Sequence, residues 1–415
     1  MKNKYTVLVI GGGTAGIMTA AQLKKKDKNL DVAIIEPSEY HYYQPAWTLV
    51  GVNEYDYAKT RRSMQSQIPQ GVTWIKDYAE KFHPEKNTVT TRSGSEIAYD
   101  FLVVAPGLVM APELVEGLTD ALDKGVVCSN YTDPENTWRV LQQFKGGTAL
   151  FTQPTTPIKC GGAPQKIMYL AEDYFNKSGK RKGTDIVFAT AGSVIFGVKP
   201  IAKTLMEVVD RKDINLRFGY NLVGVDGQEN IAWYEMADHE KEYNHKDVKV
   251  IIDGKRKGIK FDMLHLAPPQ AAPKFIRESP LVDETKWISV DKGTMQHTRF
   301  KNIFGLGDAA GLPTAKTGAA VRKQVPVIVE NLMRLMAAKG LSDKRYDGYS
   351  SCPLVTDIGK MVLAEFDYDN NFTPDPKLKQ LLIRDSSKEH WRLWMLKKYI
   401  LPYLYWNKMM KGIDV

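Results

Sequence analysis

The chain opens with an apolar run that is typical of a buried parallel strand. Residues 5–10 (YTVLVI) are β-branched and apolar, a glycine-rich segment follows, and residues 17–26 have helical spacing. Residues 31–37 (DVAIIEP) repeat the strand pattern and carry an acid, Glu36, near their end. The order strand, glycine turn, helix, strand and acid predicts a unit that binds a dinucleotide.

Three glycines in this segment, Gly11, Gly13 and Gly16, have the spacing G-x-G-x-x-G. They permit a tight turn and the close approach of a pyrophosphate, which then rests on the positive end of the helix. Glu36 lies twenty residues beyond Gly16, where a carboxylate can accept both hydroxyls of an adenosine ribose. Because Glu36 would repel a 2′-phosphate, the pattern disfavours NADP and leaves FAD or NAD. A purely structural glycine turn is the alternative.

Two distant segments indicate FAD. Residues 302–313 (NIFGLGDAAGLP) predict a strand, a Gly-x-Gly-Asp turn and the start of a helix. They resemble the second fingerprint of flavoproteins with two dinucleotide-binding domains, in which the aspartate, here Asp308, binds the ribitol of FAD. Residues 99–108 (YDFLVVAPGL) resemble the strand and turn that close the same domain, although Pro106 replaces the usual small polar residue.

In such flavoproteins a second Rossmann-like domain, inserted in the first, binds NAD(P)H. The corresponding residues 183–198 contain the strand, but Gly192 and Gly197 are five apart, with the bulky SVIF between them. This pattern indicates that the fold is kept while NADH is not the electron donor. A divergent NAD loop that still works is the alternative.

A single thiol, Cys160, stands before a predicted helix whose first turn contains Pro164. The helix N-terminus and the neighbouring Lys159 favour the thiolate and lower its pKa. Cys352 lies 192 residues downstream in a turn-rich stretch closed by a proline. The two form a redox pair only if the fold brings them together; taken singly, each is a small buried hydrophobe. No second cysteine within thirty residues completes a CxxC pair or a zinc knuckle, so we expect no metal site.

Five long motifs are spread over the chain: HYYQPAWTLVG (41–51), PIKCGGAPQKIMYL (157–170), LPTAKTGAAV (312–321), YDGYSSCPLVT (346–356) and LAEFDYD (363–369). Together they resemble the sulfide:quinone oxidoreductases, and within them the subgroup that includes the animal mitochondrial enzymes. The similarity runs from the first strand to LYWNKMMKG near the end of the chain.

The resemblance implies an FAD-dependent enzyme whose redox cysteines are Cys160 and Cys352. Hydrosulfide attacks the oxidised pair, a persulfide forms on Cys352, and Cys160 is released as a thiolate beside the flavin. Two electrons then pass through FAD to a membrane quinone. The acceptor of the sulfur stays open among glutathione or another low-molecular-weight thiol, sulfite, cyanide and a further sulfide that yields polysulfide. Cys128 is interpreted as structural, and no histidine is assigned as a general base.

The resemblance also implies a set of flavin contacts. Lys316 would place a cation near the flavin pyrimidine and stabilise the anionic reduced flavin, although it can also be a solvated surface lysine. The whole set of cofactor-binding residues is Gly11, Gly13, Thr14, Ala15, Gly16, Glu36, Gln44, the main chain of Ala79, Asp308 and Lys316.

The C-terminal stretch 389–412 interleaves aromatic and aliphatic residues with arginine and lysine, and Pro402 interrupts it. It predicts two short amphipathic helices, separated at Pro402, that lie in a membrane interface. A pair of helices packed on the core is the alternative. The net charge of +9 fits an anionic surface, and the chain has no long Lys/Arg run of the kind that would indicate nucleic acid. No stretch reaches the ~18 apolar residues of a spanning helix.

These features predict a peripheral (monotopic) protein on the cytoplasmic side of the cell membrane. Because a strand occupies the first residues, we expect no signal or transit peptide. The expected fold is α/β, with two Rossmann-like domains, the second inserted in the first, and a membrane-binding tail. The domains are an FAD-binding domain (1–120 and 285–345), a second Rossmann-like domain (121–284) and a C-terminal region (346–415). An oligomer is compatible with the sequence.

Three other functions are alternatives. A type II NADH:quinone oxidoreductase would have an intact second glycine loop and would not need Cys160 or Cys352. A soluble pyridine-nucleotide disulfide reductase would carry two close cysteines near the first helix, where this chain has none. A non-enzymatic flavin-bearing sensor of sulfide or persulfide is the third alternative.

Overall fold

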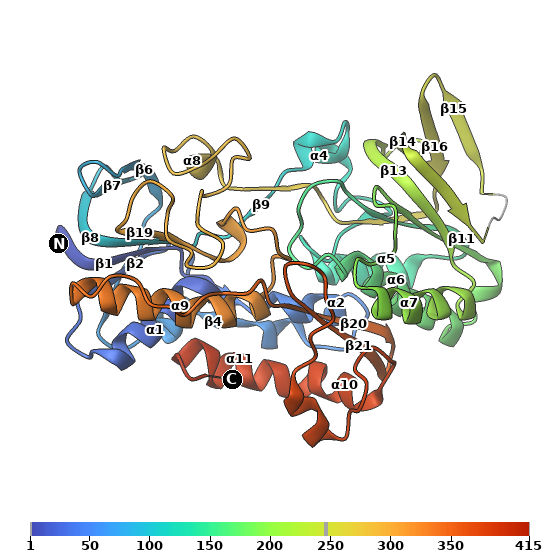
Figure 1. Cartoon of the computed structure of the whole chain (residues 1–415). Helices are drawn as coiled ribbons and strands as arrows, with labels where there is room; N and C mark the ends of the chain where they lie inside the picture. The colour runs from blue at the N-terminus through green and yellow to red at the C-terminus, as the bar shows by residue number, and fades with distance from the viewer. Residues whose placement is uncertain (1, 245–247, 415) are drawn as a thin grey trace.

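Two β-sheets lie side by side in the computed structural model, which describes residues 2–244 and 248–414. Figure 1 shows the first sheet with its helices on one side of the molecule, the second sheet on the other, and the C-terminal region beneath both. The fold is therefore α/β, with mixed parallel and antiparallel sheets.

The first sheet has seven strands in the order β5-β2-β1-β8-β7-β6, and β19 pairs with β8. Strands β5, β2, β1, β8 and β19 are parallel to one another, whereas β7 pairs antiparallel with both β8 and β6. The bounds are β1 Lys4–Ile10, β2 Val32–Ile35, β5 Val72–Ile75, β6 Ala79–His83, β7 Thr88–Thr91, β8 Glu96–Val104 and β19 Ile303–Gly305.

Strand β1 is buried on both faces, which explains its unbroken apolar run. Val7 and Val9 pack in the same core as helices α1 (Thr14–Lys26) and α9 (Gly318–Met336). Leu8 and Ile10 point to the opposite core, which also contains Ile276 of the short helix α8 (Lys274–Arg277). The predicted strand, glycine turn, helix and second strand of the first residues are confirmed.

The second sheet has eight strands in the order β10-β17-β11-β12-β13-β14-β16-β15. It is parallel from β10 to β13 and antiparallel beyond β13. Its strands are β10 Val127–Cys128, β11 Gly147–Gln153, β12 Thr184–Thr190, β13 Asn215–Asp226, β14 Ile231–Tyr243, β15 Val250–Asp253, β16 Arg256–Lys260 and β17 Met263–Leu266. Helices α5 (Pro134–Gln143), α6 (Ala163–Lys177) and α7 (Lys199–Arg211) share one core with it.

Two chain segments connect the sheets, and a short strand in each pairs with the other. Strand β9 (Val109–Met110) leads out of the first sheet, and β18 (Gln270–Ala271) leads back, as an antiparallel pair. All strands of the second sheet thus lie in sequence between β8 and β19. Helix α4 (Leu118–Ala121) packs on the second sheet. The predicted domain boundaries stay predictions.

The C-terminal region contacts both halves. It begins with the hairpin of β20 (Ser350–Asp357) and β21 (Lys360–Phe366), which shares the core of α6 and α7. Cys352 lies inside β20, so the expectation of a turn-rich stretch was wrong. Its neighbour Pro353 is tolerated because the sheet has only two strands and each is an edge.

The predicted break at Pro402 is also wrong. The backbone is helical from α10 (Trp391–Met395) through a π-helical segment (Leu396–Ile400) into α11 (Leu401–Asn407). Pro402 falls in the first turn of α11, and the amide of Leu401 donates to the carbonyl of Leu396. This widened π turn accommodates the proline, which lacks an N–H group.

Short elements complete the fold: β3 Tyr40–Tyr42, β4 Arg61–Ser63, α2 Trp47–Val50 and α3 Met64–Gln67. Strands β3 and β4 pair antiparallel beside the glycine turn. Across the described part of the chain, no helix combines the length and apolar character needed to span a membrane.

Candidate active site: a cysteine pair beside a glycine loop

The glycine loop between β1 and α1 has the geometry of a ligand cradle. Gly11 has a φ of +101°, and a Cβ there would overlap the backbone of Ala105. A Cβ on Gly16 would overlap the carbonyl oxygen of Gly11. A Cβ on Gly13 would meet nothing within 4 Å, so open space lies above the loop. Thr14 and Ala15 begin helix α1, whose first amides point to that space.

Glu36 follows β2 and lies against this loop. The Gly12 amide donates to Glu36 Oε2 at 2.6 Å, and the Ser38 amide donates to Oε1 at 2.7 Å. Burial raises the pKa of Glu36, although these two amide bonds act in the opposite direction. Ala79, the first residue of β6, follows β5, the neighbour of β2 in the sheet.

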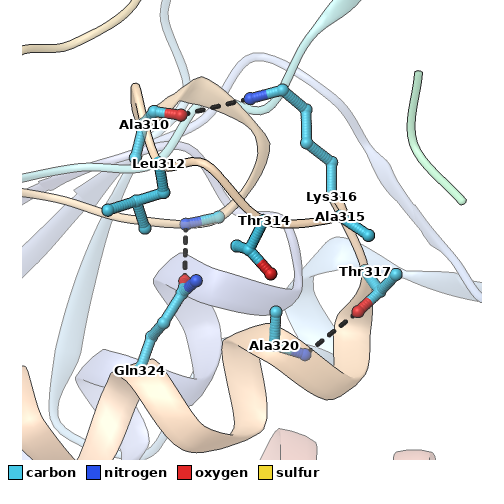
Figure 2. Close-up of a pocket in the computed structure, with 9 residues that line it drawn as sticks. Ala310, Leu312, Thr314, Ala315, Lys316, Thr317, Ala320 and Gln324 are labelled. Atoms are coloured by element: carbon cyan, nitrogen blue, oxygen red, sulfur yellow. Dashed lines mark hydrogen bonds between the residues drawn. The ribbon is translucent and has the colours of Figure 1, made fainter. Parts of the chain in front are cut away.

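Asp308 and Lys316 lie in the turn between β19 and α9. Lys316 Nζ donates to the carbonyl oxygens of Asp308 and Ala310, at 2.6 and 3.1 Å, and lies 3.8 Å from the centre of the Trp287 ring. Figure 2 shows its ammonium group directed at Ala310, beside a cavity of about 10 Å³ that extends to Gln324 of α9. Burial lowers the pKa of Lys316 to about 8.

The Asp308 carboxylate is half-buried and accepts no hydrogen bond from residues 2–244 or 248–414. Burial raises its pKa, and the nearby cations Lys316 and Lys159 oppose that shift. A half-buried carboxylate without a protein donor suits a ligand hydroxyl.

The structure brings Cys160 and Cys352 together. Their Sγ atoms lie 3.3 Å apart, although 192 residues separate them in sequence. Both are free thiols, and their separation exceeds the ~2.0 Å of a disulfide bond. Cys160 is half-buried before α6, and Cys352 is buried in β20. The pair therefore joins the entrance of one helix to a strand of the C-terminal region.

Two local features allow this approach. Cys160 has a φ of +87°, a left-handed conformation that is strained for a residue with a side chain. Gly162 supplies the necessary space, since a Cβ there would lie 2.8 Å from Cys352 Sγ and would overlap the side chain of Leu354. Gly161, by contrast, has nothing within 4 Å of a Cβ position. The sequence CGG thus contains one glycine that the contact requires and one that it does not.

The cation beside the thiol is Lys166, and the expectation that Lys159 has this role was wrong. Lys166, the fourth residue of α6, donates from Nζ to Cys160 Sγ at 3.1 Å. The chain turns away after residue 159, so Lys159 Nζ donates instead to Gln44 Oε1 at 2.5 Å. Gln44, another predicted cofactor contact, is thereby tied to the residue preceding Cys160.

The two thiols are electrostatically unequal. The hydrogen bond from Cys352 and the ammonium of Lys166 hold the pKa of Cys160 well below its usual range, against the effect of burial. The same hydrogen bond and burial raise the pKa of Cys352 well above it. Burial favours neutral Lys166, but the two cysteines hold its pKa above the ordinary value. Cys160 is therefore the thiolate of the pair, and Cys352 is its donor.

A second buried cation reaches this site from the C-terminal helix. Lys397 lies in the π-helical segment, and its Nζ donates to the carbonyl of Pro45 at 2.7 Å. Its side chain is buried, and burial together with the Lys166 charge lowers its pKa to about 7, while the two cysteines oppose the shift. Its positive charge also lowers the pKa of Cys160.

The cysteine turn and the Asp308 turn are neighbours. Lys159 and Lys316 form an isolated parallel bridge between the two segments, and the charge of Cys160 contributes to the raised pKa of Asp308. The thiolate therefore lies beside the segment that the sequence assigned to the cofactor.

The sequence of this chain was compared with known proteins. The family described as pyridine nucleotide-disulphide oxidoreductase matches residues 5–141. The mitochondrial sulfide:quinone oxidoreductase of Mus musculus is 42% identical over 413 residues, which cover 99% of this chain and 87% of that protein. The chain belongs to the sulfide:quinone oxidoreductase family. It is therefore an enzyme of the flavin-dependent oxidoreductase class.

Two further relatives agree with this assignment. The mitochondrial sulfide:quinone oxidoreductase of Dictyostelium discoideum is 41% identical, over 99% of this chain and 87% of that protein. The crystal structure of the sulfide:quinone oxidoreductase from Aquifex aeolicus superposes with a TM-score of 0.76 at 18% identity, covering 99% of this chain and 92% of the other. The solved structure supports the fold, and the curated relatives support the family.

The residues fit the flavin-type cofactor that this family implies. The glycine loop leaves a space that a Cβ on Gly13 would enter, and helix α1 presents its amides there. Glu36 keeps acceptor capacity on both oxygens, and Asp308 has a carboxylate without a protein donor. The second glycine segment differs: Gly192 and Gly197 lack the positive φ of Gly11, and the Gly192 amide donates to Thr190 Oγ1.

Sequence reasoning missed a polar link between the C-terminal helix and the glycine loop. Tyr405 OH lies 2.7 Å from Thr14 Oγ1 and 2.5 Å from His41 Nε2, while His41 Nδ1 donates to the Gly12 carbonyl at 2.9 Å. Burial lowers the pKa of His41 to about 4, so the ring is neutral and Nε2 accepts from Tyr405. No local signal in the sequence pairs residues 14 and 405.

Cys128 is separate from this chemistry. It is fully buried in the core of the second sheet, and burial raises its pKa far above the ordinary thiol value. These features favour the structural interpretation of this thiol. Within residues 2–244 and 248–414, no group of three or more His, Cys, Asp and Glu side chains could hold a metal ion.

Proposed function

We propose that this chain oxidises hydrosulfide at the Cys160–Cys352 pair and passes two electrons through FAD to a membrane quinone. The observation that carries the proposal is the 3.3 Å approach of two sulfurs, one of them bonded to the ammonium of Lys166. A thiolate beside a second cysteine is the arrangement that thiol–disulfide exchange needs.

The difference in pKa between the two thiols determines which sulfur hydrosulfide attacks in the exchange. The sulfur with the lower pKa is the better leaving group, so hydrosulfide attacks Cys352 of the oxidised pair. The Cys160–Cys352 bond breaks, Cys160 leaves with the bonding electrons, and Cys352 becomes a persulfide. Lys166, at 3.1 Å, stabilises the thiolate that leaves.

A small thiol then removes the outer sulfur and leaves Cys352 as a thiolate. When the two thiolates return to a disulfide, they give up two electrons, which a bound flavin would relay to quinone. In total, hydrogen sulfide, a thiol and a quinone give a hydropersulfide and a quinol. Glutathione or another low-molecular-weight thiol suits this step, and sulfite or a second sulfide can replace it. Because Cys352 is only 2% exposed, the acceptor must be small or slender where it meets the sulfur.

FAD supplies the two-electron relay between the thiolate and quinone. Gly11, Gly13 and Gly16 give the loop its shape, and the amides of Thr14 and Ala15 receive the pyrophosphate. The remaining contacts are Glu36 for the adenosine ribose, Asp308 for the ribitol, and Gln44, Ala79 and Lys316. The FAD-binding part spans 1–120 and 285–345, and the inserted second part, 121–284, does not bind NADH.

The quinone is reached from a membrane on which the C-terminal helix rests. Four of its residues form an exposed row at intervals of four: Trp391 (58% exposed), Met395 (42%), Tyr399 (56%) and Tyr403 (57%). Leu393, Trp394, Tyr405 and Trp406 are buried on the protein side. A helix packed by one face and apolar on the other suits peripheral attachment. We expect this face to meet the cytoplasmic side of the cell membrane, and an oligomer is compatible with it.

The cysteine mechanism is tested by replacing each thiol. Cys160→Ser and Cys352→Ser should each lower sulfide-dependent flavin reduction by on the order of 10³-fold or more, with FAD still bound. Cys128→Ala is the matched control, because its thiol is buried like that of Cys352 but lies outside the pair, and it should keep the activity. Stopped-flow bleaching of the flavin after adding sulfide gives the rate. Full activity in either serine variant would refute the proposal.

The same flavin-bleaching assay distinguishes the proposed function from the alternatives. Bleaching by NADH but not by sulfide would identify a type II NADH:quinone oxidoreductase. Bleaching by sulfide without steady turnover of a soluble quinone would identify a sensor. We expect bleaching by sulfide, steady quinone reduction and no reaction with NADH.

A further inference from the structure

A basic cleft lies between the C-terminal helix and residues 54–62. Its volume is about 550 Å³. One wall includes Lys59, Arg61 and Arg62, and the other includes Lys398, Tyr399 and Tyr403. Strand β4 and helix α11, which carry part of these walls, lie on the same lower side of the molecule in Figure 1. None of the residues assigned to sulfide or FAD lines this cleft.

The cleft has an excess of positive charge. Four cations and two carboxylates line it, and one carboxylate, Glu54, pairs with Lys398 at 2.6 Å. The other, Asp56, accepts the Ala58 amide at 2.9 Å as the cap of a short helical turn. Among the described residues, no carboxylate pairs with Lys59, Arg61 or Arg62. Three cations thus face the cleft without an anionic partner.

Aromatic faces hold two of these cations in place. The Arg61 guanidinium lies 4.6 Å from the centre of the Tyr40 ring, and that of Arg62 lies 4.4 Å from the centre of the Trp406 ring. Trp406 is itself buried in the core that includes α1. A guanidinium stacked on a ring keeps its in-plane N–H groups available, in the geometry that suits a phosphate. The arginines are therefore positioned before any ligand arrives.

The cleft is continuous with the exposed apolar row. Tyr399 and Tyr403 belong to the row and also line the cleft. If the row enters the boundary between headgroups and acyl chains, the cleft lies at the depth of the lipid phosphates. Tyrosine is the residue type that bridges those two zones.

We propose that this cleft binds the phosphate of an anionic phospholipid through Lys59, Arg61 and Arg62. The inference rests on the proposed membrane contact of the C-terminal helix. Charge complementarity supports it, and the shared tyrosines favour a phosphate attached to a lipid over a free one. The site gives the protein a preference for anionic membranes and fixes its orientation on them.

Vesicle binding of the full-length holoenzyme tests the proposal. The double variant Arg61→Gln/Arg62→Gln should lose roughly tenfold or more of its affinity for phosphatidylcholine vesicles that contain phosphatidylglycerol. Its weaker binding to pure phosphatidylcholine vesicles should not change, because the apolar row is intact. Sedimentation of protein with vesicles, at one fixed salt concentration, gives both affinities.

The matched control is Arg92→Gln/Arg299→Gln. These arginines are also exposed and also stack on aromatic rings, at 3.7 Å from Tyr78 and 4.9 Å from Phe300, but they do not line the cleft. The control removes the same net charge and should lose much less affinity. If both double variants lose the same affinity for anionic vesicles, the effect comes from the overall charge of the protein, and the proposal is overturned.

The other outcomes are also distinct. If the cleft variant binds anionic vesicles as tightly as the wild type, the cleft proposal fails while the membrane contact survives. If the wild type binds neither kind of vesicle, both fail, and sulfide-dependent flavin bleaching still reports on the enzyme. Calorimetry without vesicles tests for a free ligand. If the wild type binds inorganic phosphate and the variant does not, the cleft binds a free phosphate, and the proposal of a lipid phosphate is overturned.

Discussion

The glycine loop and the cysteine pair are neighbouring sites that the chain builds in different ways. The loop is continuous in sequence, and its shape depends on contacts of Gly11 and Gly16 with nearby backbone. The pair joins Cys160 to Cys352 across 192 residues, with cations from α6 and from the C-terminal helix. A local site can be recognised from its motif, whereas an assembled site needs every contributing segment to be folded.

The C-terminal helix connects the two sites. Lys397 reaches the surroundings of the cysteines, and Tyr405, two turns later, hydrogen-bonds Thr14 in the glycine loop. The helix that is proposed to rest on the membrane therefore lies against both the cysteine pair and the glycine loop. Deleting it would disturb both sites, so its membrane role is better tested by single substitutions on its exposed face.

The largest effect is expected at the local site. Gly16→Ala forces a Cβ onto the Gly11 carbonyl oxygen, so the turn must open and the protein should lose its flavin almost completely. Gly13→Ala adds its methyl group to open space, so the unfolding temperature of the apoprotein should not change. It should still weaken FAD binding, since that space is where the pyrophosphate would lie. Flavin absorbance and thermal unfolding separate the two effects. Normal flavin content in Gly16→Ala would contradict the cradle geometry.

An intermediate effect is expected where the assembled site is most crowded. Gly162→Ala places a Cβ 2.8 Å from Cys352 Sγ and separates the sulfurs, so sulfide-dependent bleaching should fall by about 100-fold or more with FAD retained. Gly161→Ala, one residue earlier, meets nothing and should behave as the wild type. Bleaching rates at matched flavin content provide the comparison. Equal rates in the two variants would show that the 3.3 Å approach is not needed.

The smallest effect is expected from the more distant cation. Lys397→Met should raise the apparent pKa of Cys160, because it removes one of the positive charges that favour the thiolate. Because Lys397 itself loses its proton near pH 7, its charge acts below that pH, and variant and wild type should converge above it. Lys398→Met is the control, since that lysine points outward to Glu54. The pH dependence of alkylation at Cys160, followed by mass spectrometry, gives the pKa. An unchanged pKa of Cys160 in Lys397→Met would show that the charge on the C-terminal helix does not act on the thiol.

The sequence predicted much of the cofactor side. The strand, glycines, helix and acid of the first residues are present as expected, and Asp308 lies in a turn beside them. Such motifs can be recognised because backbone sterics and a helix N-terminus act over a few residues. The assignment of Lys159 as the cation beside Cys160 failed for a local reason. Cys160 has a left-handed backbone conformation, Lys159 Nζ bonds to Gln44 Oε1, and Lys166 donates to the thiol instead.

The family could be recognised from the sequence, which also predicted the dinucleotide loop and proposed Cys160 and Cys352 as the redox cysteines. Only the tertiary structure decided that these cysteines touch, that Lys166 and Lys397 surround them, and that Tyr405 meets Thr14. It also decided that the helix passes Pro402 without a break and that Lys59, Arg61 and Arg62 share a cleft with it. The physical reason is that periodicity and motif spacing record local geometry, whereas packing sets the distances between residues far apart in the chain.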